Sequence, residues 1–380
     1  MTTAFINGRI LTNHGLQSGC AVLVEDDRIA GLALPSDPRV RAAERHDLEG
    51  RYLLPGFIDC QVNGGGGVLF NEAPTVEGIR AIGEAHQRFG TTGFLPTLIS
   101  DDVDVMRKAI AAVDEAIETG VPGVLGIHIE GPYLAPARKG VHDADKFRIP
   151  DEEELALVSS LKRGVTVLTL APDQVPVEKI RRLVEAGVIV AGGHTAADYA
   201  TTRAALDNGV RGFTHLFNAM TPFTSREPGV VGAALEDPDS WCGLIVDGHH
   251  VHPASLRVAI AAKAAGKMFL VTDAMPPVGA HDPHFVLNGE TITAEDGICR
   301  TADGVLAGSA LDMASAIRNC VQQLDLPVAE AARMAATYPA DFLGFERTHG
   351  HISAGYRADF AVLDEHFSLQ ETWIGGRRLI

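Results

Sequence analysis

Eight short apolar runs recur through the middle of the chain, and each ends in polar residues. Runs that are apolar throughout, rather than alternating, are typical of parallel strands buried on both faces of a sheet. Amphipathic segments such as residues 75–90 lie between them. This alternation predicts a (β/α)8 TIM barrel, with a doubly wound open sheet as the alternative. The runs are residues 56–64, 92–100, 123–132, 164–173, 187–195, 211–220, 241–250 and 268–275.

The two ends of the chain have a different texture. Residues 1–52 and 350–380 contain short alternating strands joined by Gly, Asn and Asp turns. Such segments predict a small β-sandwich domain built from both chain ends, with the barrel over residues 53–349. Residues 276–310 follow the eighth run and predict an inserted loop or hairpin.

Composition narrows the class of protein. The chain has 380 residues and a net charge of −17, which argues against nucleic acid as a partner. It has no apolar run long enough for a membrane span and no evident secretory signal. Five scattered cysteines without a CxxC pair favour reduced thiols, so we expect a cytoplasmic protein; they are Cys20, Cys60, Cys242, Cys299 and Cys320.

Four residues with catalytic chemistry fall at the ends of predicted strands. A lone histidine on an apolar strand is usually a hydrogen-bonded core residue. In a barrel, however, the carboxyl ends of the strands form the active site. One carboxylate and two imidazoles make a three-ligand divalent site, the pattern of a catalytic zinc. The four residues are Glu130, His194, His215 and Asp273.

Several motifs together resemble the amidohydrolase superfamily and, within it, the N-acetylglucosamine-6-phosphate deacetylase family. They are LPGFIDCQVNG, GIHIEGPYLAPARKGVH, GGHT, THLFNAM, DGHHVHP, LVTDAM, LAGSALDM and GHISAGYRADFAVLD. The resemblance implies a small-molecule substrate, N-acetyl-D-glucosamine 6-phosphate, that is cleaved to acetate and glucosamine 6-phosphate in amino-sugar catabolism or cell-wall recycling. It also implies a homodimer in which Arg226 reaches the neighbouring site.

The resemblance further assigns roles to individual residues. It implies that Glu130, His194 and His215 bind the metal, that Asp273 is the catalytic acid and base, and that His142 polarises the acetyl carbonyl. The residues it places around the substrate are Gln61, Asn63, Val141, Asn218, Ala219, Arg226, Asp247, His250, Leu306, Ala307, Gly308 and Ser309. Arg226 and His250 are expected to bind the phosphate.

The first strand decides how many metal ions to expect. In the family, His-x-His at this point accompanies two metals, and Gln-x-Asn accompanies one. This chain has Gln61 and Asn63, and an amide is a poor ligand for a transition metal beside imidazole. We therefore expect one divalent ion per chain, with Zn²⁺ favoured and Fe²⁺, Co²⁺ or Mn²⁺ as alternatives. Gln61 and Asn63 are expected to brace the site or its water.

Three other functions compete with this interpretation. The nearest is the same chemistry on N-acetylgalactosamine 6-phosphate, whose sugar differs at one hydroxyl. Ring-amide hydrolysis, as in dihydroorotase-like relatives, usually requires His-x-His and often a bridging lysine, and the predicted strand tips offer neither. A catalytically inactive barrel kept as a binding scaffold is disfavoured by the complete set of Glu130, His194, His215 and Asp273.

Overall fold

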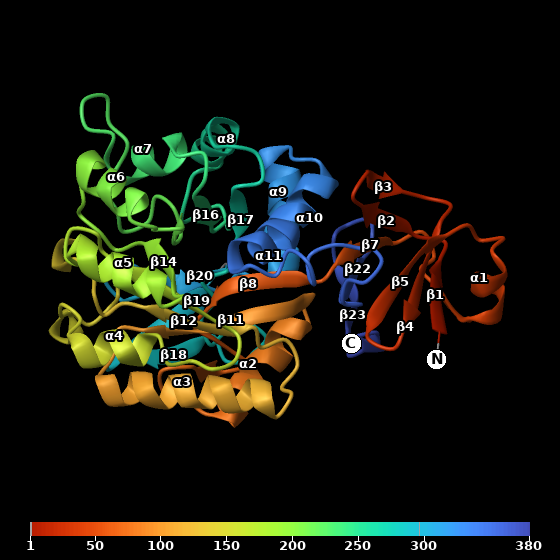
Figure 1. Ribbon diagram of the computed structural model, residues 1–380, viewed down its shortest axis with the longest axis horizontal. Coiled ribbons are helices and arrows are strands. Elements are labelled where there is room, and N and C mark those ends of the chain that lie inside the picture. Colours follow the sequence, from red (N-terminus) through yellow and green to blue (C-terminus); the bar gives the residue numbers. More distant parts are fainter. Residues whose placement is uncertain (1, 296) are drawn as a thin grey trace.

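A computed structural model describes residues 2–295 and 297–380. Its largest sheet has eight parallel strands, and the order follows the sequence from one edge to the other. The predicted (β/α)8 TIM barrel is therefore confirmed (Figure 1). The barrel strands are β8 (Phe57–Val62), β11 (Thr91–Ile99), β12 (Gly126–Glu130), β13 (Val165–Leu170), β14 (Ile189–Gly192), β15 (Gly212–Phe213), β16 (Trp241–Leu244) and β17 (Met268–Leu270).

A helix follows each of the first seven strands and packs its apolar face on the barrel. In the first of them, the Thr75 hydroxyl caps the helix by accepting the Gly78 N–H, and Ile79 and Ile82 are buried. These helices are α2 (Val76–Gln87), α3 (Val103–Glu118), α4 (Glu152–Val158), α5 (Val177–Glu185), α6 (Tyr199–Asp207), α7 (Gly229–Glu236) and α8 (Pro253–Ala262). After the eighth strand come α9 (Met313–Leu324), α10 (Val328–Ala335) and α11 (Thr337–Leu343).

The chain ends form the predicted β-sandwich beside the barrel, and both termini lie in it (Figure 1). One sheet has the order β5-β4-β1-β6 and the other β24-β23-β22-β7-β2-β3. Apolar side chains from both chain ends, including Phe5, Phe360 and Trp373, fill the space between the sheets. The strands are β1 (Thr2–Ile6), β2 (Arg9–Thr12), β3 (Gly15–Gln17), β4 (Ala21–Glu25), β5 (Arg28–Ala33), β6 (Glu44–Asp47), β7 (Tyr52–Pro55), β22 (Phe360–Leu363), β23 (Leu369–Ile374) and β24 (Arg377–Arg378), with the short helix α1 (Pro38–Ala42).

The boundary between sandwich and barrel lies slightly later than the sequence predicts. We expected the barrel to begin at residue 53, but all of β7 pairs with β22 in the six-stranded sheet. Leu53, Leu54 and Pro55 therefore belong to the sandwich, and Gly56 separates β7 from β8. Apolar residues continue through this segment, so the sequence pattern does not indicate where the chain passes from the sandwich to the barrel.

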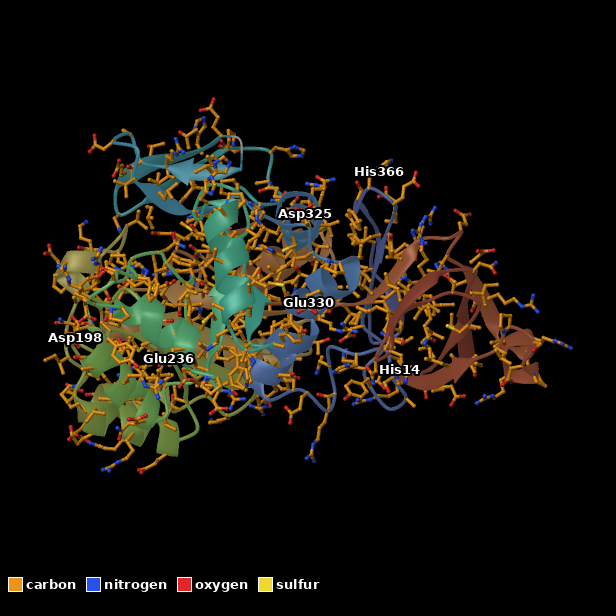
Figure 2. The ribbon with its side chains drawn as sticks, turned by 90° about the horizontal axis from the view of Figure 1, so that it is seen from above. His14, Asp198, Glu236, Asp325, Glu330 and His366 are labelled. Atoms are coloured by element: carbon orange, nitrogen blue, oxygen red, sulfur yellow. The ribbon has the colours of Figure 1, made fainter. Side chains whose placement is uncertain are left out.

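The segment after β17 is a small antiparallel sheet rather than a loop or single hairpin. It consists of β18 (His284–Leu287), β19 (Glu290–Glu295), β20 (Ile298–Arg300) and β21 (Leu306–Ser309). We call these four strands the insertion. It stands on one side of the barrel when the molecule is seen from above (Figure 2). An apolar cluster that includes Leu69, Ile99, Met275 and Cys299 attaches it to the barrel mouth, beside the short hairpin of β9 (Gly64–Gly65) and β10 (Val68–Leu69).

Within residues 2–295 and 297–380, none of the helices is long and apolar enough to cross a membrane.

Candidate active site

The ends of three barrel strands bring Glu130, His194 and His215 together. Their candidate ligand atoms all lie within 4.8 Å of one another, and the three residues are buried. His215 Nε2 is 3.0 Å from Glu130 Oε1 and 3.0 Å from His194 Nε2, and His194 Nε2 is 3.2 Å from Glu130 Oε1. Ligand atoms of a tetrahedral site with bonds of about 2.0 Å lie about 3.3 Å apart. The spacing therefore fits one small divalent cation.

The hydrogen bonds around the cluster also suit a metal site. His194 Nδ1 is 2.9 Å from the Arg138 carbonyl oxygen, which can only accept, so Nδ1 carries the proton and Nε2 offers its lone pair. The other ring nitrogen of His215, Nδ1, is buried and has no hydrogen-bond partner among the described residues. Burial alone would raise the pKa of Glu130, but the adjacent imidazoles of His194 and His215 hold it well below its ordinary value. The donor set thus holds one anionic oxygen and two imidazole nitrogens.

The side chains of Gln61 and Asn63 face carboxylates. Asp273 Oδ1 accepts hydrogen bonds from Gln61 Nε2 at 3.0 Å and from Asn63 Nδ2 at 2.7 Å. Gln61 Nε2 also lies 3.2 Å from Glu130 Oε2, so this one amide joins the candidate ligand to the candidate base. Both amides donate to the same oxygen, Oδ1. Asp273 Oδ2 has no hydrogen bond to the described residues.

Asp273 lies at the tip of the eighth strand, next to this amide pair. Burial and the negative charge of Glu130 together raise the pKa of Asp273 to about 6, against the opposing effects of His215, His250 and the Asn63 hydrogen bond. A carboxyl group that titrates near neutral pH suits a residue that must take up a proton and release it again.

His142 comes from the loop after β12, and Ser100 at the end of β11 fixes its ring. The Ser100 backbone N–H donates to His142 Nδ1 at 3.3 Å, and the Ser100 Oγ is 2.8 Å from the same atom. Because Nδ1 accepts, Nε2 carries the proton of the neutral ring. Burial, together with the charge of His194, lowers the pKa of His142 to about 3. His142 is therefore a neutral hydrogen-bond donor.

His250 is held by Asp247 in the loop after β16. Its Nδ1 lies 2.6 Å from Asp247 Oδ2, and Asp247 Oδ1 accepts the backbone N–H groups of His249 and His250. The side chains of Asp247 and His250 are only 3% and 5% exposed. Asp247 thus orients His250 and leaves the His250 Nε2 free to contact a ligand.

A cavity of about 270 Å³ at the barrel mouth collects most of the sequence-predicted residues. Its lining includes Asn63, Glu130, Val141, His142, His194, His215, Asn218, Ala219, His250, Asp273, Leu306 and Gly308. Gln61 and Asp247 lie behind the lining and contact it through Asp273 and His250. Ala307 packs into the apolar cluster under the insertion, and the Ser309 Oγ donates to the Thr272 carbonyl, so neither side chain lines the cavity.

Arg226, which the sequence predicts to bind the phosphate, is not among the residues that line this cavity. It is exposed in the loop before α7, it does not line the cavity, and it contacts no acidic side chain within the described parts of the chain. Within the described residues, Arg226 therefore stands outside the lining that contains Glu130, His194 and His215.

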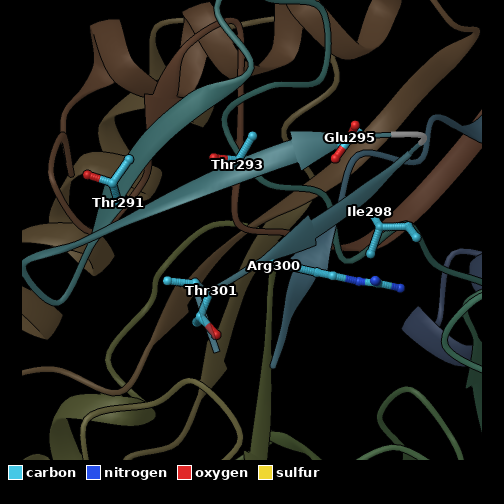
Figure 3. A pocket seen from close by; sticks show the side chains of 7 residues that line it. Thr291, Thr293, Glu295, Ile298, Arg300 and Thr301 are labelled. Carbon is cyan, nitrogen blue, oxygen red and sulfur yellow. The ribbon is translucent and has the colours of Figure 1, made fainter. Parts of the chain in front are cut away.

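A second hollow, of about 320 Å³, lies on the insertion (Figure 3). Its lining consists of Thr291, Thr293, Glu295, Ile298, Arg300, Thr301 and Ala302. The three residues that can hold a metal line the barrel cavity instead. The barrel cavity is therefore the candidate active site.

Ser100 and Asp59 have no role in the sequence-based predictions, although Asp59 lies in the first apolar run. Both fall in or at the end of predicted strand runs, and reading every strand tip, rather than only metal-binding residue types, would have identified Ser100. The Asp59 carboxylate is fully buried beneath the cavity, where burial raises its pKa to about 7. Ile99, Met275 and Val305 also line the cavity, and their apolar side chains gave no signal in the sequence.

Comparisons with known proteins identify the relatives of this chain. Residues 52–379 match the model of the amidohydrolase family. The chain is 43% identical over 372 residues to N-acetylgalactosamine-6-phosphate deacetylase of Shewanella sp. (strain ANA-3), covering 98% of this chain and 94% of the relative. It is 34% identical over 380 residues to N-acetylglucosamine-6-phosphate deacetylase of Haemophilus influenzae (strain ATCC 51907 / DSM 11121 / KW20 / Rd), covering 99% of each.

A solved structure is similar over the whole molecule. The N-acetylglucosamine-6-phosphate deacetylase of Pasteurella multocida superposes with a TM-score of 0.96 at 35% identity, covering 100% of both chains. The family model covers most of the chain, and the relatives match nearly all of it. The resemblance found in the sequence motifs is therefore confirmed, and the chain belongs to the amidohydrolase family.

Proposed function

We propose that this chain hydrolyses the acetamide of N-acetyl-D-glucosamine 6-phosphate, releasing acetate and D-glucosamine 6-phosphate. It is a hydrolase of amide C–N bonds, as its family indicates. The observation that carries the proposal is the convergence in one cavity of Glu130, His194, His215, His142 and Asp273. The relatives from Haemophilus and Pasteurella are named for this substrate, and the relative from Shewanella for its galactosamine epimer.

Glu130, His194 and His215 are proposed to hold one divalent cation, with Zn²⁺ favoured by the ligand set. Bound there, the ion supplies Lewis-acid activation of a water and of the acetyl carbonyl. Gln61 and Asn63 direct N–H groups, which are not metal ligands, at Asp273 and Glu130. This arrangement supports a single ion per chain.

Asp273 is proposed to transfer protons, and His142 is proposed to donate a hydrogen bond to the acetyl oxygen. Asp273 Oδ1 is held by two amides, so Oδ2 takes the proton from the attacking water. The neutral His142 donates its Nε2–H to the acetyl oxygen as negative charge develops there. Asp273 then passes its proton to the sugar nitrogen, and the C–N bond breaks. One carboxyl group thereby serves as base and then as acid.

The phosphate and the second subunit form the next part of the proposal. His250, oriented by Asp247, is proposed to contact the phosphate, together with Asn218 and Ala219 at the cavity wall. Val141, Leu306 and Gly308 border the sugar and acetyl group, with Ala307 and Ser309 supporting that wall. Arg226 is exposed and is not part of its own cavity lining, which supports a homodimer in which it reaches the neighbouring site. The five free cysteines favour a cytoplasmic location.

A substrate panel tests the proposal directly. Acetate release is measured on the glucosamine and galactosamine epimers, each with and without the 6-phosphate, using protein of known metal content. We expect the highest kcat/KM on N-acetylglucosamine 6-phosphate and loss of activity in a chelator that returns on adding Zn²⁺. Preference for the galactosamine epimer would change the named substrate but keep the chemistry. No acetate from any of the four, with metal bound, would support an inactive scaffold.

A further inference from the structure

The barrel closes where its first strand, β8, meets its eighth, β17. These strands stand at opposite ends of the strand order, and their direct backbone pairing lies just beyond β17. There the Asp273 N–H donates to the Gln61 carbonyl at 3.0 Å, and the Asn63 N–H donates to the Ala274 carbonyl at 2.9 Å. We call this junction the seam. The seam therefore carries Gln61 and Asn63 on one side and Asp273 on the other.

A side chain bridges the seam one step deeper in the barrel. Asp59 lies in β8, and Thr272 lies on the opposite side of the seam. The Asp59 carboxylate accepts hydrogen bonds from the Thr272 O–H at 2.5 Å and from the Thr272 N–H at 3.2 Å. It also accepts the Gln61 N–H of its own strand at 3.2 Å. Asp59 and Thr272 are both 0% exposed. A buried carboxylate is costly unless hydrogen-bonded, and these three donors satisfy it.

Thr272 directly precedes Asp273, whose backbone is held from both sides. The Ser309 N–H donates to the Asp273 carbonyl at 2.9 Å, and the Ser309 Oγ donates to the Thr272 carbonyl at 2.6 Å. Asp273 has a φ of 53°, a left-handed conformation that a non-glycine residue keeps only where its surroundings fix it. The contacts of Thr272 with Asp59 and Ser309 are part of those surroundings.

We propose that Asp59 and Thr272 are positioning residues: they fix the register of the seam and so hold the Asp273 carboxylate against Gln61 and Asn63. This inference rests on the proposed function, in which Asp273 moves the proton. Neither residue lines the cavity, so their effect reaches the substrate through Asp273. Loss of the bridge should therefore impair the chemical step more than substrate binding.

The test compares Thr272→Val, which removes the hydroxyl, with Thr272→Ser, which keeps it. Thr372→Val is a matched control, because Thr372 is also 0% exposed and its hydroxyl donates to the Gln87 carbonyl at 2.6 Å, but it lies in β23 of the sandwich. We expect Thr272→Val to lose kcat by about 10- to 100-fold, with KM within about threefold of wild type. Bound metal should be unchanged, Thr272→Ser should recover most of kcat, and Thr372→Val should keep it.

Three results would overturn the inference. They are wild-type kcat in Thr272→Val, no recovery in Thr272→Ser, or a loss of kcat in Thr372→Val as large as that in Thr272→Val. If Thr272→Val does not fold, Thr272→Ala, which also removes the hydroxyl, is measured in its place, and wild-type kcat in that variant overturns the inference equally. The wild-type chain is assayed alongside. A wild type that releases no acetate contradicts the proposed function, whereas an active wild type with an unaffected seam variant contradicts only the role of the seam.

Discussion

Residues at the barrel mouth hold their backbones in the left-handed region. The φ angles are 46° for His194, 32° for His215, 49° for Ala219 and 53° for Asp273. Such a conformation costs a non-glycine residue about 1–3 kcal/mol and persists where the surrounding structure fixes it. All four residues line the cavity. We infer that stability is lost here in order to place two imidazoles and a carboxylate within one small space.

At this scale the sharpest prediction concerns Asp273. Asp273→Asn keeps the shape of the side chain, and its amide oxygen can still accept from Gln61 and Asn63, but it cannot carry the proton. We expect kcat to fall by about 10²–10⁴-fold, as for loss of a general acid–base group. Metal content should stay at the wild-type level, because Glu130, His194 and His215 are intact. Steady-state kinetics with elemental analysis checks this, and near-wild-type turnover would require a different base.

Secondary structure elements were the part of the fold most open to prediction from sequence. All eight barrel strands lie within the predicted runs or within one residue of them, because apolar runs bounded by glycine and polar residues specify buried parallel strands. The sixth strand, β15, covers only Gly212 and Phe213, although the run extends to Met220. Beyond it the chain adopts positive φ at His215, Phe217 and Ala219. Tertiary contacts impose those angles, so no local pattern reveals them.

The candidate site was predictable in its residue types and less so in its contacts. Strand tips identified Glu130, His194, His215 and Asp273 because a barrel places all its strand ends on one face. The bridge from Asp59 to Thr272 joins residues 213 positions apart, and the Ser100 contact with His142 depends on a loop conformation. Sequence spacing carries no information about either. The burial of the Ala307 and Ser309 side chains is likewise visible only in the structure.

The tip of the first strand determines the expected metal content. Because Gln61 and Asn63 donate to Asp273 and Glu130, we expect one tightly bound divalent ion per chain. Elemental analysis of fully active protein checks the ratio, and two equivalents would contradict it. Glu130→Gln should serve as the comparison, since it removes the anionic ligand and should lower the bound metal well below one equivalent.

The connection from α11 to β22 should make the protein sensitive to acid. Burial, with the charges of Arg357 and Arg28, lowers the pKa of His349 to about 4, and its side chain is 17% exposed. Its unfolded pKa is about 6.5. His349 is therefore neutral in both states above pH 6.5, and stability is lost as the pH falls from 6.5 towards 4, because only the unfolded chain binds the proton readily.

We predict that the unfolding free energy depends on pH differently in wild type and in His349→Gln. Between pH 6.5 and 4, wild type should lose about 1–3 kcal/mol more unfolding free energy than the variant, at about 1.4 kcal/mol per pKa unit. Denaturant titrations at a series of pH values measure this difference. Asp359, whose Oδ2 lies 3.9 Å from His349 Nε2, is present in both proteins. Parallel pH curves for the two proteins would contradict the assignment.

At the scale of the whole molecule, the net negative charge affects how a phosphorylated substrate is bound. A net charge of −17 repels a phosphorylated sugar at long range, although salt screens that repulsion beyond roughly 8 Å. Affinity for the phosphate must therefore come from donors in direct contact with it. Arg226 lies on an exposed loop that also carries Phe223, which is 65% exposed. Under the proposed homodimer, this loop would contact the second copy of the chain.

Arg226→Ala should weaken kcat/KM for the 6-phosphate by roughly 10- to 150-fold, since a hydrogen bond to a charged group contributes about 1.5–3 kcal/mol. Turnover of the unphosphorylated sugar should barely change. Equal losses on both substrates would show that Arg226 supports the fold instead. Mixed dimers of Arg226→Ala and Asp273→Asn chains test the crossing. If the arginine crosses the interface, one site has both residues intact and activity returns; if it does not, each site keeps one lesion.

The small sandwich can be completed only late in synthesis of the chain. β7 pairs with β2 on one side and β22 on the other, and β22 begins at Phe360, after the whole barrel has been made. Until then the N-terminal strands leave an open sheet edge and an apolar face that later receives Phe360, Val362 and Trp373. Open edges of this kind promote association between nascent chains. A ribosome that stops between residues 343 and 360 therefore releases a chain whose barrel sequence is complete but whose first domain is unprotected.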